Sequence, residues 1–261
     1  MLVALASAKG SPGVTTTARV LASVWPRDVV LVDADPAGGD LALLARGQDG
    51  RPLDPERGLM SFAADARRGL ADRPVEDHLQ QVVGGLDVMC GVGSPDQMVG
   101  VAPALPQLGA TLGRLPDRDV VLDLGRLDPS SPALPLAAAA HVLVLVVRPH
   151  LEAYAHLRSR LRWLAQVSDP RARVPRTGVL LVADSRDRHS ARDLAQLIAH
   201  EQLPARLVGQ VADDARAADV IAGRLERPVS RSLLVRSVRD VVDPVRALGA
   251  AGAPAPTRTH A

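Results

Sequence analysis

The sequence is poor in aromatic residues and cysteine, and each shortage excludes a class of function. Phe, Trp and Tyr make up 2% of the 261 residues, so the core has to be built from Val, Leu and Ala. So few rings argue against a platform that stacks the bases of single-stranded nucleic acid. The single cysteine, Cys90, excludes an intramolecular disulfide and an all-cysteine metal site, which fits a reducing compartment.

Long hydrophobic runs and targeting signals are also scarce. Met1–Ser7 lacks a charged region followed by a long apolar stretch, so we predict no signal peptide. The longest apolar run, Leu134–Val147, is interrupted by His141 and is shorter than the ~20 residues that a membrane-spanning helix needs. We interpret it as a helix end followed by a buried strand. The histidines show no metal-ligand spacing and predict no zinc site.

Lysine occurs once, as Lys9, against 30 arginines, and the formal net charge is only +2. Such an arginine bias is typical of a GC-rich genome, because solvated positions accept either residue. The two differ where a compact point charge must enter a tight site. Lys9 lies inside a glycine-containing loop, which favours a functional role for it over chance survival of one lysine codon.

Short apolar runs alternate with longer amphipathic segments along the chain. The apolar runs are continuous rather than alternating, as in strands buried on both faces, and comprise Leu2–Ala6, Val29–Val32, Leu86–Met89, Val120–Leu122, His141–Val147, Gly178–Val182 and Arg206–Val211. The candidate helices are Thr15–Val24, Leu59–Arg68, Gln97–Leu115, Leu151–Val167, Ala191–Gln202, Ala215–Arg224 and Leu233–Leu248. This alternation predicts an α/β fold with a twisted, mostly parallel sheet of about seven strands and helices on both faces. We expect one domain over residues 1–249, a surface loop at Gly47–Arg57 and a disordered tail over residues 250–261.

The first twenty residues run from a strand through a glycine-containing loop into a helix. Backbone N–H groups at such a turn, together with the helix N-terminus, attract phosphate. Gly10 and Gly13 allow the backbone to approach a ligand closely. Thr15 stands where its hydroxyl could reach Mg²⁺.

Carboxylates follow two later strands. Asp33 and Asp35 end the strand that begins at Val29, and Asp123 ends the strand that begins at Asp119. The carboxyl ends of parallel strands meet at one edge of a sheet, where ligands bind. We therefore expect the loop and these carboxylates to converge, although Asp33 could simply cap the loop after its strand.

Together these segments resemble the MinD/ParA family of P-loop NTPases. The segment Lys9-Gly-Ser-Pro-Gly-Val-Thr-Thr is similar to the family's deviant Walker A loop, Lys-Gly-Gly-x-Gly-Lys-[Ser/Thr]-Thr, and its GSPGVT form resembles a sub-group from high-GC bacteria. Val32-Asp-Ala-Asp-Pro-Ala-Gly is similar to the switch I segment, and the strand ending at Asp123 to a Walker B strand. Val208-Gly-Gln-Val-Ala-Asp-Asp and Arg227-Pro-Val resemble the stretch after the family's last strand. The resemblance implies a three-layer P-loop NTPase fold.

The resemblance also implies roles for the site residues. Lys9 would be the signature lysine that reaches the nucleotide of a dimer partner, and Asp35, or Asp33 beside it, would orient the attacking water. Thr15, Asp33 and Asp123 would surround Mg²⁺. ATP would be bound by the loop and by the turn after the third strand, at Gly10, Ser11, Pro12, Gly13, Val14, Thr15, Thr16, Gly125 and Arg126.

The sequence departs from the family pattern at the loop. The family's phosphate lysine falls at Val14, Ser11 replaces the second glycine, and Pro12 removes one N–H donor. A unit charge at 4 Å contributes ~4 kcal/mol at an effective dielectric constant near 20, and desolvation offsets part of it. We expect a loss of about two decades in nucleotide affinity and a larger loss in hydrolysis. Arg126 or Arg148 could replace the lysine, or both could be solvated loop arginines.

Other charged residues have structural interpretations beside functional ones. Asp213 and Asp214 could cap the helix that begins at Ala215, or contact an adenine. Arg158, Arg160 and Arg162 could touch DNA phosphates or an anionic membrane, but such a row is more often a solvated helix face. The last helix contains Pro244 and mixed charge, unlike a basic amphipathic membrane tail.

The sequence therefore leaves three functions open. The first is an ATP-dependent dimerising switch that positions or partitions a cellular machine or a chromosome, or determines a septum site, with weak ATPase activity. The second is a degenerate, non-hydrolysing scaffold of a pilus or secretion system. The third is a small-carboxylate ligase on the same fold. The resemblance implies a cytoplasmic homodimer joined through its nucleotide face, with an unknown protein partner and with DNA or the inner membrane face as further surfaces.

Overall fold

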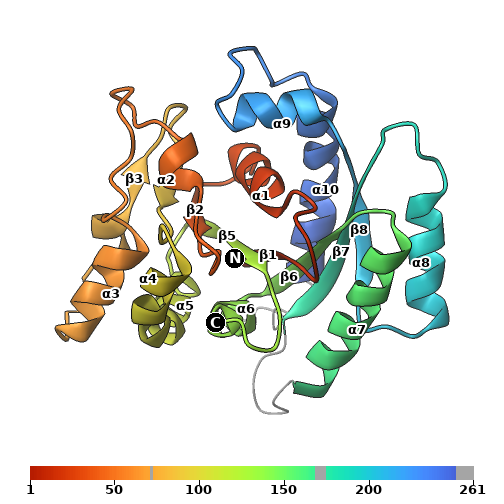
Figure 1. The fold of residues 1–261 in the computed structure, drawn as a ribbon, viewed down its shortest axis with the longest axis horizontal. Coiled ribbons are helices and arrows are strands. Elements are labelled where there is room, and N and C mark those ends of the chain that lie inside the picture. Colours follow the sequence, from red (N-terminus) through yellow and green to blue (C-terminus); the bar gives the residue numbers. More distant parts are fainter. Residues whose placement is uncertain (71–72, 168–174, 251–261) are drawn as a thin grey trace, which may run out of the picture.

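The computed structural model describes residues 1–70, 73–167 and 175–250. An eight-stranded sheet in the order β3-β4-β2-β5-β1-β6-β7-β8 runs through its centre (Figure 1). Neighbouring strands are parallel except β3 and β4, which are antiparallel. The strands are Leu2–Ser7 (β1), Val29–Asp33 (β2), Gln80–Gln81 (β3), Asp87–Met89 (β4), Asp119–Arg126 (β5), Val142–Val147 (β6), Arg176–Ala183 (β7) and Arg206–Ala212 (β8).

Helices cover both faces of the sheet, and an apolar core fills each side. One layer contains Val14–Ser23 (α1), Leu41–Leu44 (α2), Ala215–Ile221 (α9) and Leu233–Ala250 (α10). The other contains Leu59–Arg67 (α3), Pro95–Val101 (α4), Leu105–Leu112 (α5), Leu134–Ala139 (α6), Leu151–Val167 (α7) and Ser190–His200 (α8). Two 3-10 turns, Val75–His78 (η1) and Ala102–Ala104 (η2), complete the described elements.

The predicted α/β class is confirmed, and all seven predicted strands are present. Their continuous apolar runs predict them well, because β1, β2 and β6 are buried along their whole length. The eighth strand, β3, has only two residues, too few for any periodic pattern. The apolar run at Leu134–Val147 is a helix followed by a strand, as predicted.

The single helix predicted over Gln97–Leu115 is wrong. The chain forms α4, η2 and α5 there instead. Pro103 lies in η2 and Pro106 in the first turn of α5, and a proline cannot continue the helix that precedes it. At the other end, α10 includes Ala250, the first residue of the expected tail, whereas residues 251–261 lie outside the described part of the chain. No helix among the described residues has the length and apolar character needed to cross a membrane.

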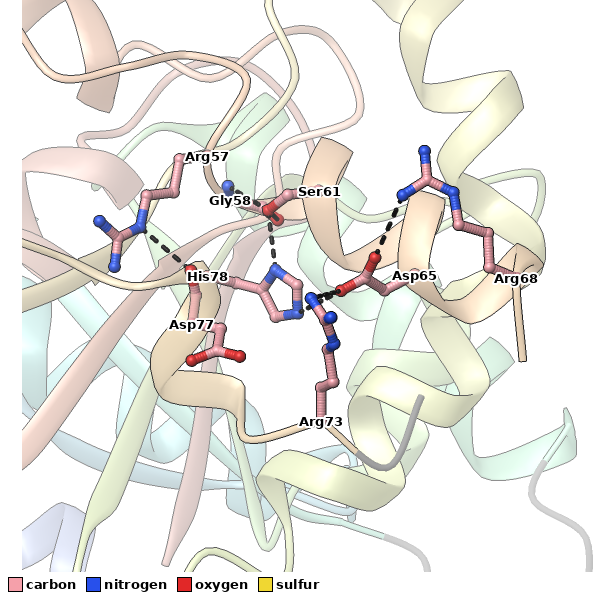
Figure 2. A network of polar contacts seen from close by, with 8 residues as sticks. All are labelled: Arg57, Gly58, Ser61, Asp65, Arg68, Arg73, Asp77 and His78. Carbon is pink, nitrogen blue, oxygen red and sulfur yellow. Dashed lines mark hydrogen bonds and ion pairs between the residues drawn. The ribbon is translucent and has the colours of Figure 1, made fainter. Parts of the chain in front are cut away.

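A polar network ties α3 to η1 at the side of the molecule (Figure 2). The Asp65 carboxylate lies 3.6 Å from Arg68, 3.5 Å from Arg73 and 3.9 Å from His78. His78 is buried, and its Nδ1 lies 2.8 Å from the Ser61 hydroxyl. Ser61 also exchanges hydrogen bonds with the backbone of Gly58, so we interpret this network as structural.

Candidate functional site

The loop between β1 and α1 has the geometry of a phosphate cradle. Gly13 immediately precedes α1 with φ 101°, and Gly10 has φ 72°, conformations that side chains disfavour. The Ser7 hydroxyl donates to the Gly10 carbonyl over 3.1 Å and fixes the start of the turn. α1 begins directly after this loop, and the N-terminus of a helix stabilises an anion.

Asp33 and Asp123 face each other in the register between β2 and β5. Both are nearly inaccessible, at 3% and 2% exposure. Asp33 accepts hydrogen bonds from the backbone N–H groups of Leu41, at 3.0 Å, and Asp35, at 3.4 Å. A Cβ on Gly39 would overlap the Asp33 carboxylate, so this glycine is needed for close packing. These contacts favour the loop-capping interpretation of Asp33.

Asp123 lies directly beneath the loop. Its carboxylate accepts a 3.0 Å hydrogen bond from the backbone N–H of Gly125, and the nearby Thr15 hydroxyl also lowers its pKa. Burial raises the pKa of Asp123 to about 6, although both of these groups oppose the rise. Burial, followed by the neighbouring Asp123 carboxylate, raises the pKa of Asp33 to about 7. Two buried carboxylates with raised pKa values mark a functional site more often than a structural one.

Asp35 lies against the last residues of β5, where the register with β1 shifts. Gly125 in this part of the strand has φ 57°, and a Cβ there would overlap the Asp35 carboxyl group. Asp35 accepts a 2.8 Å hydrogen bond from Ala37 N–H, and burial raises its pKa. The segment after β2 therefore touches the end of β5, in keeping with the predicted convergence.

A cavity of about 730 Å³ opens above these residues. The predicted site residues that line it are Gly10, Ser11, Gly13, Val14, Thr15, Thr16, Asp35, Gly125 and Arg126. Its lining also includes Asp40, Asp128, Ser130 and Ser131, which sequence reasoning missed. They follow the ends of β2 and β5 within a few residues, and that position is the signal that could have found them. Of the described residues, no three His, Cys, Asp or Glu side chains gather as a metal-binding group.

Lys9 points away from this cavity. Its ammonium nitrogen lies 3.0 Å from Nε2 of His156 on α7, a contact that sequence reasoning missed. Lys9 lines a separate, smaller cavity of about 240 Å³ with Pro12, Arg148 and His156. Within a single chain, Lys9 therefore does not face the cavity that contains Thr15.

Val14 is 5% exposed and belongs to the apolar core beneath α1 with Val3, Leu5 and Ala18. It also lines the cavity. The position that carries the phosphate lysine in the family pattern therefore contributes packing here and no charge.

The two candidate arginines differ in exposure and in how closely a carboxylate holds them. Arg126 is exposed at the cavity, 3.8 Å from Asp128. Arg148 instead makes a two-pronged pair with Asp213, one bond of which is 3.0 Å. Asp214 caps α9 by accepting from Ala217 N–H over 3.0 Å, which confirms the capping interpretation for that residue.

The arginine row on α7 has mostly structural partners. Arg158 and Arg162 both pair with Glu201 near the end of α8, at 3.0 and 2.9 Å. The Arg160 guanidinium lies over the Trp163 ring, 5.1 Å from its centroid. These contacts favour the structural interpretation of the row over a nucleic-acid or membrane surface.

The structure is similar to solved structures of ParA and MinD proteins. A ParA family ATPase from Chlorobium tepidum is 16% identical with a TM-score of 0.71, over 92% of this chain and 96% of that one. The cell division ATPase MinD of Pyrococcus furiosus is 18% identical with a TM-score of 0.71, over 95% and 98% of the two chains. The septum site-determining protein MinD of Pyrococcus horikoshii, complexed with Mg-ADP, is 17% identical with a TM-score of 0.68, over 97% and 98%. No protein-family model matches the chain, and no curated protein matches its sequence.

The fold is therefore the α/β fold of the P-loop nucleotide-binding proteins. Within that class the arrangement of the elements is MinD/ParA-like.

Proposed function

We propose that this chain binds Mg-ATP in the 730 Å³ cavity and acts as an ATP-dependent dimerising switch that positions or partitions a cellular machine or a chromosome. The observation that carries this proposal is the cavity itself, which the glycine-containing loop lines with Thr15 on one side and Asp35, packed against Gly125, on the other. Thr15 and Asp123 would support the metal ion, and Asp35 would position the attacking water. The Mg-ADP complex of the similar MinD protein from Pyrococcus horikoshii supports the choice of ligand.

The orientation of Lys9 supports dimerisation through the nucleotide face. Because its side chain points away from its own cavity, it is available to a nucleotide on a second chain. We expect light scattering after gel filtration to show a dimer with Mg-ATP and a monomer without it. Lys9→Ala should bind ATP yet remain monomeric, and Lys9→Arg should recover little, because a planar guanidinium replaces a compact charge. A wild-type protein that stays monomeric at millimolar Mg-ATP would contradict the switch.

The burial of Val14 favours a second function, a non-hydrolysing scaffold that binds nucleotide without turnover. Steady-state release of phosphate separates the two. If the wild type hydrolyses ATP and Lys9→Ala does not, the scaffold is ruled out. If the wild type binds ATP without hydrolysing it, the hydrolytic switch is ruled out. Val14→Lys should raise ATP affinity by roughly tenfold or more under either function.

A further inference from the structure

A groove of about 920 Å³ lies on the α1 side of the sheet, apart from the nucleotide cavity. Its floor is formed by the buried side chains of Val29 and Leu31 on β2 and Val88 on β4. α1 forms one wall, and residues 81–86, which join β3 to β4, form another. The segment between α9 and α10 contributes to the rim, and Gly223 in that segment approaches the Leu44 carbonyl of α2.

The apolar core on this side of the sheet is open at the groove. Five partly buried apolar residues that pack against this core all line it, namely Val24, Val82, Leu86, Ile221 and Val229. Val83, between β3 and β4, adds a side chain that is 66% exposed. The lining therefore combines apolar side chains with charged ones, as binding sites commonly do.

The charges around the groove are mainly positive. Four arginines line it, against two carboxylates, and these residues are Arg19, Arg27, Arg118, Arg239, Asp28 and Asp87. Asp87 pairs with Arg118, and Arg27 lies 3.8 Å from the buried Asp119. Arg19, on α1, interacts with the carboxylates of Asp33 and Asp40 outside the groove, whereas Arg239, on α10, adds positive charge that the carboxylates of the groove do not pair. An acidic occupant would therefore be favoured over a basic one.

We propose that this groove binds an acidic amphipathic helix of a partner protein. Apolar side chains at i, i+3, i+4 and i+7 would pack against Val82, Val83 and Leu86, and Asp or Glu side chains would face the arginines. The groove also shares two helices with the nucleotide site. Arg19 lies on α1, which follows the phosphate loop, and Leu41 begins α2, whose backbone N–H binds Asp33. A partner seated here would contact both elements that flank the nucleotide cavity.

The probe is a fluorescein-labelled synthetic helix of about five turns with Leu at the core positions and Glu elsewhere. A second peptide carries Lys in place of every Glu. We expect anisotropy titrations to show at least about tenfold tighter binding of the acidic peptide, and about tenfold weaker binding to Val83→Glu and Arg239→Glu. The matched controls are Val99→Glu on α4, where Val99 is 76% exposed, and Arg236→Glu on α10, both outside the groove. They should bind like the wild type.

All titrations are made without nucleotide, so failure of the ATP switch leaves this test unaffected. The four substituted positions are exposed, and equal unfolding midpoints will establish that each variant is folded. Equal binding of the two peptides, unchanged binding to the groove variants, or equal weakening in the controls would overturn the proposal. Two further results would overturn it. One is self-association of the wild type that Val83→Glu abolishes, and the other is binding of a DNA duplex to the wild type that weakens in both groove variants.

Discussion

At the scale of single residues, the site contains two buried carboxylates and lacks the lysine that the family pattern places at Val14. Asp33 and Asp123 are carboxylates held out of water beside each other, which costs free energy in the empty site. Val14 removes the cation that the family pattern places near the phosphates. Under the proposed function, the positive charge that Mg-ATP binding requires would come from Mg²⁺ and from other side chains.

Asp123→Asn should stabilise the empty protein at pH 8. The pKa of Asp123 is raised to about 6, so the folded state holds this proton more tightly than the unfolded state does. The stability that this carboxyl contributes is present below its ordinary pKa and is lost as the pH rises from about 4 to about 6. We expect urea unfolding at pH 8 to show a gain of roughly 2 kcal/mol in the variant, shrinking at pH 5. A variant less stable than the wild type at pH 8 would contradict the burial argument.

Arg126→Ala should weaken ATP binding by roughly tenfold, because Arg126 is the exposed arginine on the lining of the cavity. Arg148→Ala is the matched control, since its guanidinium is held by Asp213 and lies outside that lining. Fluorescence titration with a labelled ATP analogue measures both. Equal effects of the two substitutions would show that Arg126 does not replace the lysine.

At the scale of elements, the ends of strands and the turns after them build the site. β1 ends at the glycine-containing loop, β2 at Asp33, and β5 at Arg126, directly after Gly125. The contact between Gly125 and Asp35 depends on a backbone conformation as well as on a side chain. One substitution at Gly125 should therefore disturb two segments at once.

Gly125→Ala should destabilise the fold more than Gly69→Ala does. Both glycines have positive φ, 57° and 73°, so each alanine incurs the left-handed cost of about 1 kcal/mol. A Cβ at Gly69 meets nothing within 4 Å, whereas at Gly125 it overlaps the Asp35 carboxyl. For Gly125→Ala we expect chemical denaturation to show an additional loss of about 2 kcal/mol in the free energy of unfolding. Equal losses in the two variants would mean that Asp35 moves aside freely.

The network between α3 and η1 should make stability depend on pH (Figure 2). Burial lowers the pKa of His78, while Asp65 and Asp77 oppose that shift, and Arg57 and Arg73 add to it. A histidine with a lowered pKa binds its proton less tightly in the folded state than in the unfolded state. The stability that neutral His78 contributes is therefore lost as the pH falls below about 6.5. The wild type should lose more unfolding free energy between pH 7.5 and 5.5 than His78→Gln, by at most about 1.4 kcal/mol per pH unit. His150→Gln, at an exposed position, should follow the wild-type profile.

At the scale of the whole molecule, local patterns predict the scaffold and packing decides the rest. The buried strands β1, β2 and β6 could be predicted because their apolar runs are continuous. The predicted helix over residues 97–115 is divided at two prolines, whereas the apolar pattern continues through them. The Lys9–His156 and Arg148–Asp213 contacts join residues far apart in the chain, so no local pattern contains them. For the same reason, sequence alone leaves both Arg126 and Arg148 as candidates.

The most direct test of the central claim is calorimetric titration of ATP into the purified protein, with and without Mg²⁺. We predict one site per chain, with an affinity that Mg²⁺ strengthens and that Asp123→Asn makes insensitive to Mg²⁺. Absence of binding at millimolar ATP in the presence of Mg²⁺, from a protein shown to be folded, would contradict the assignment of the cavity as a nucleotide site.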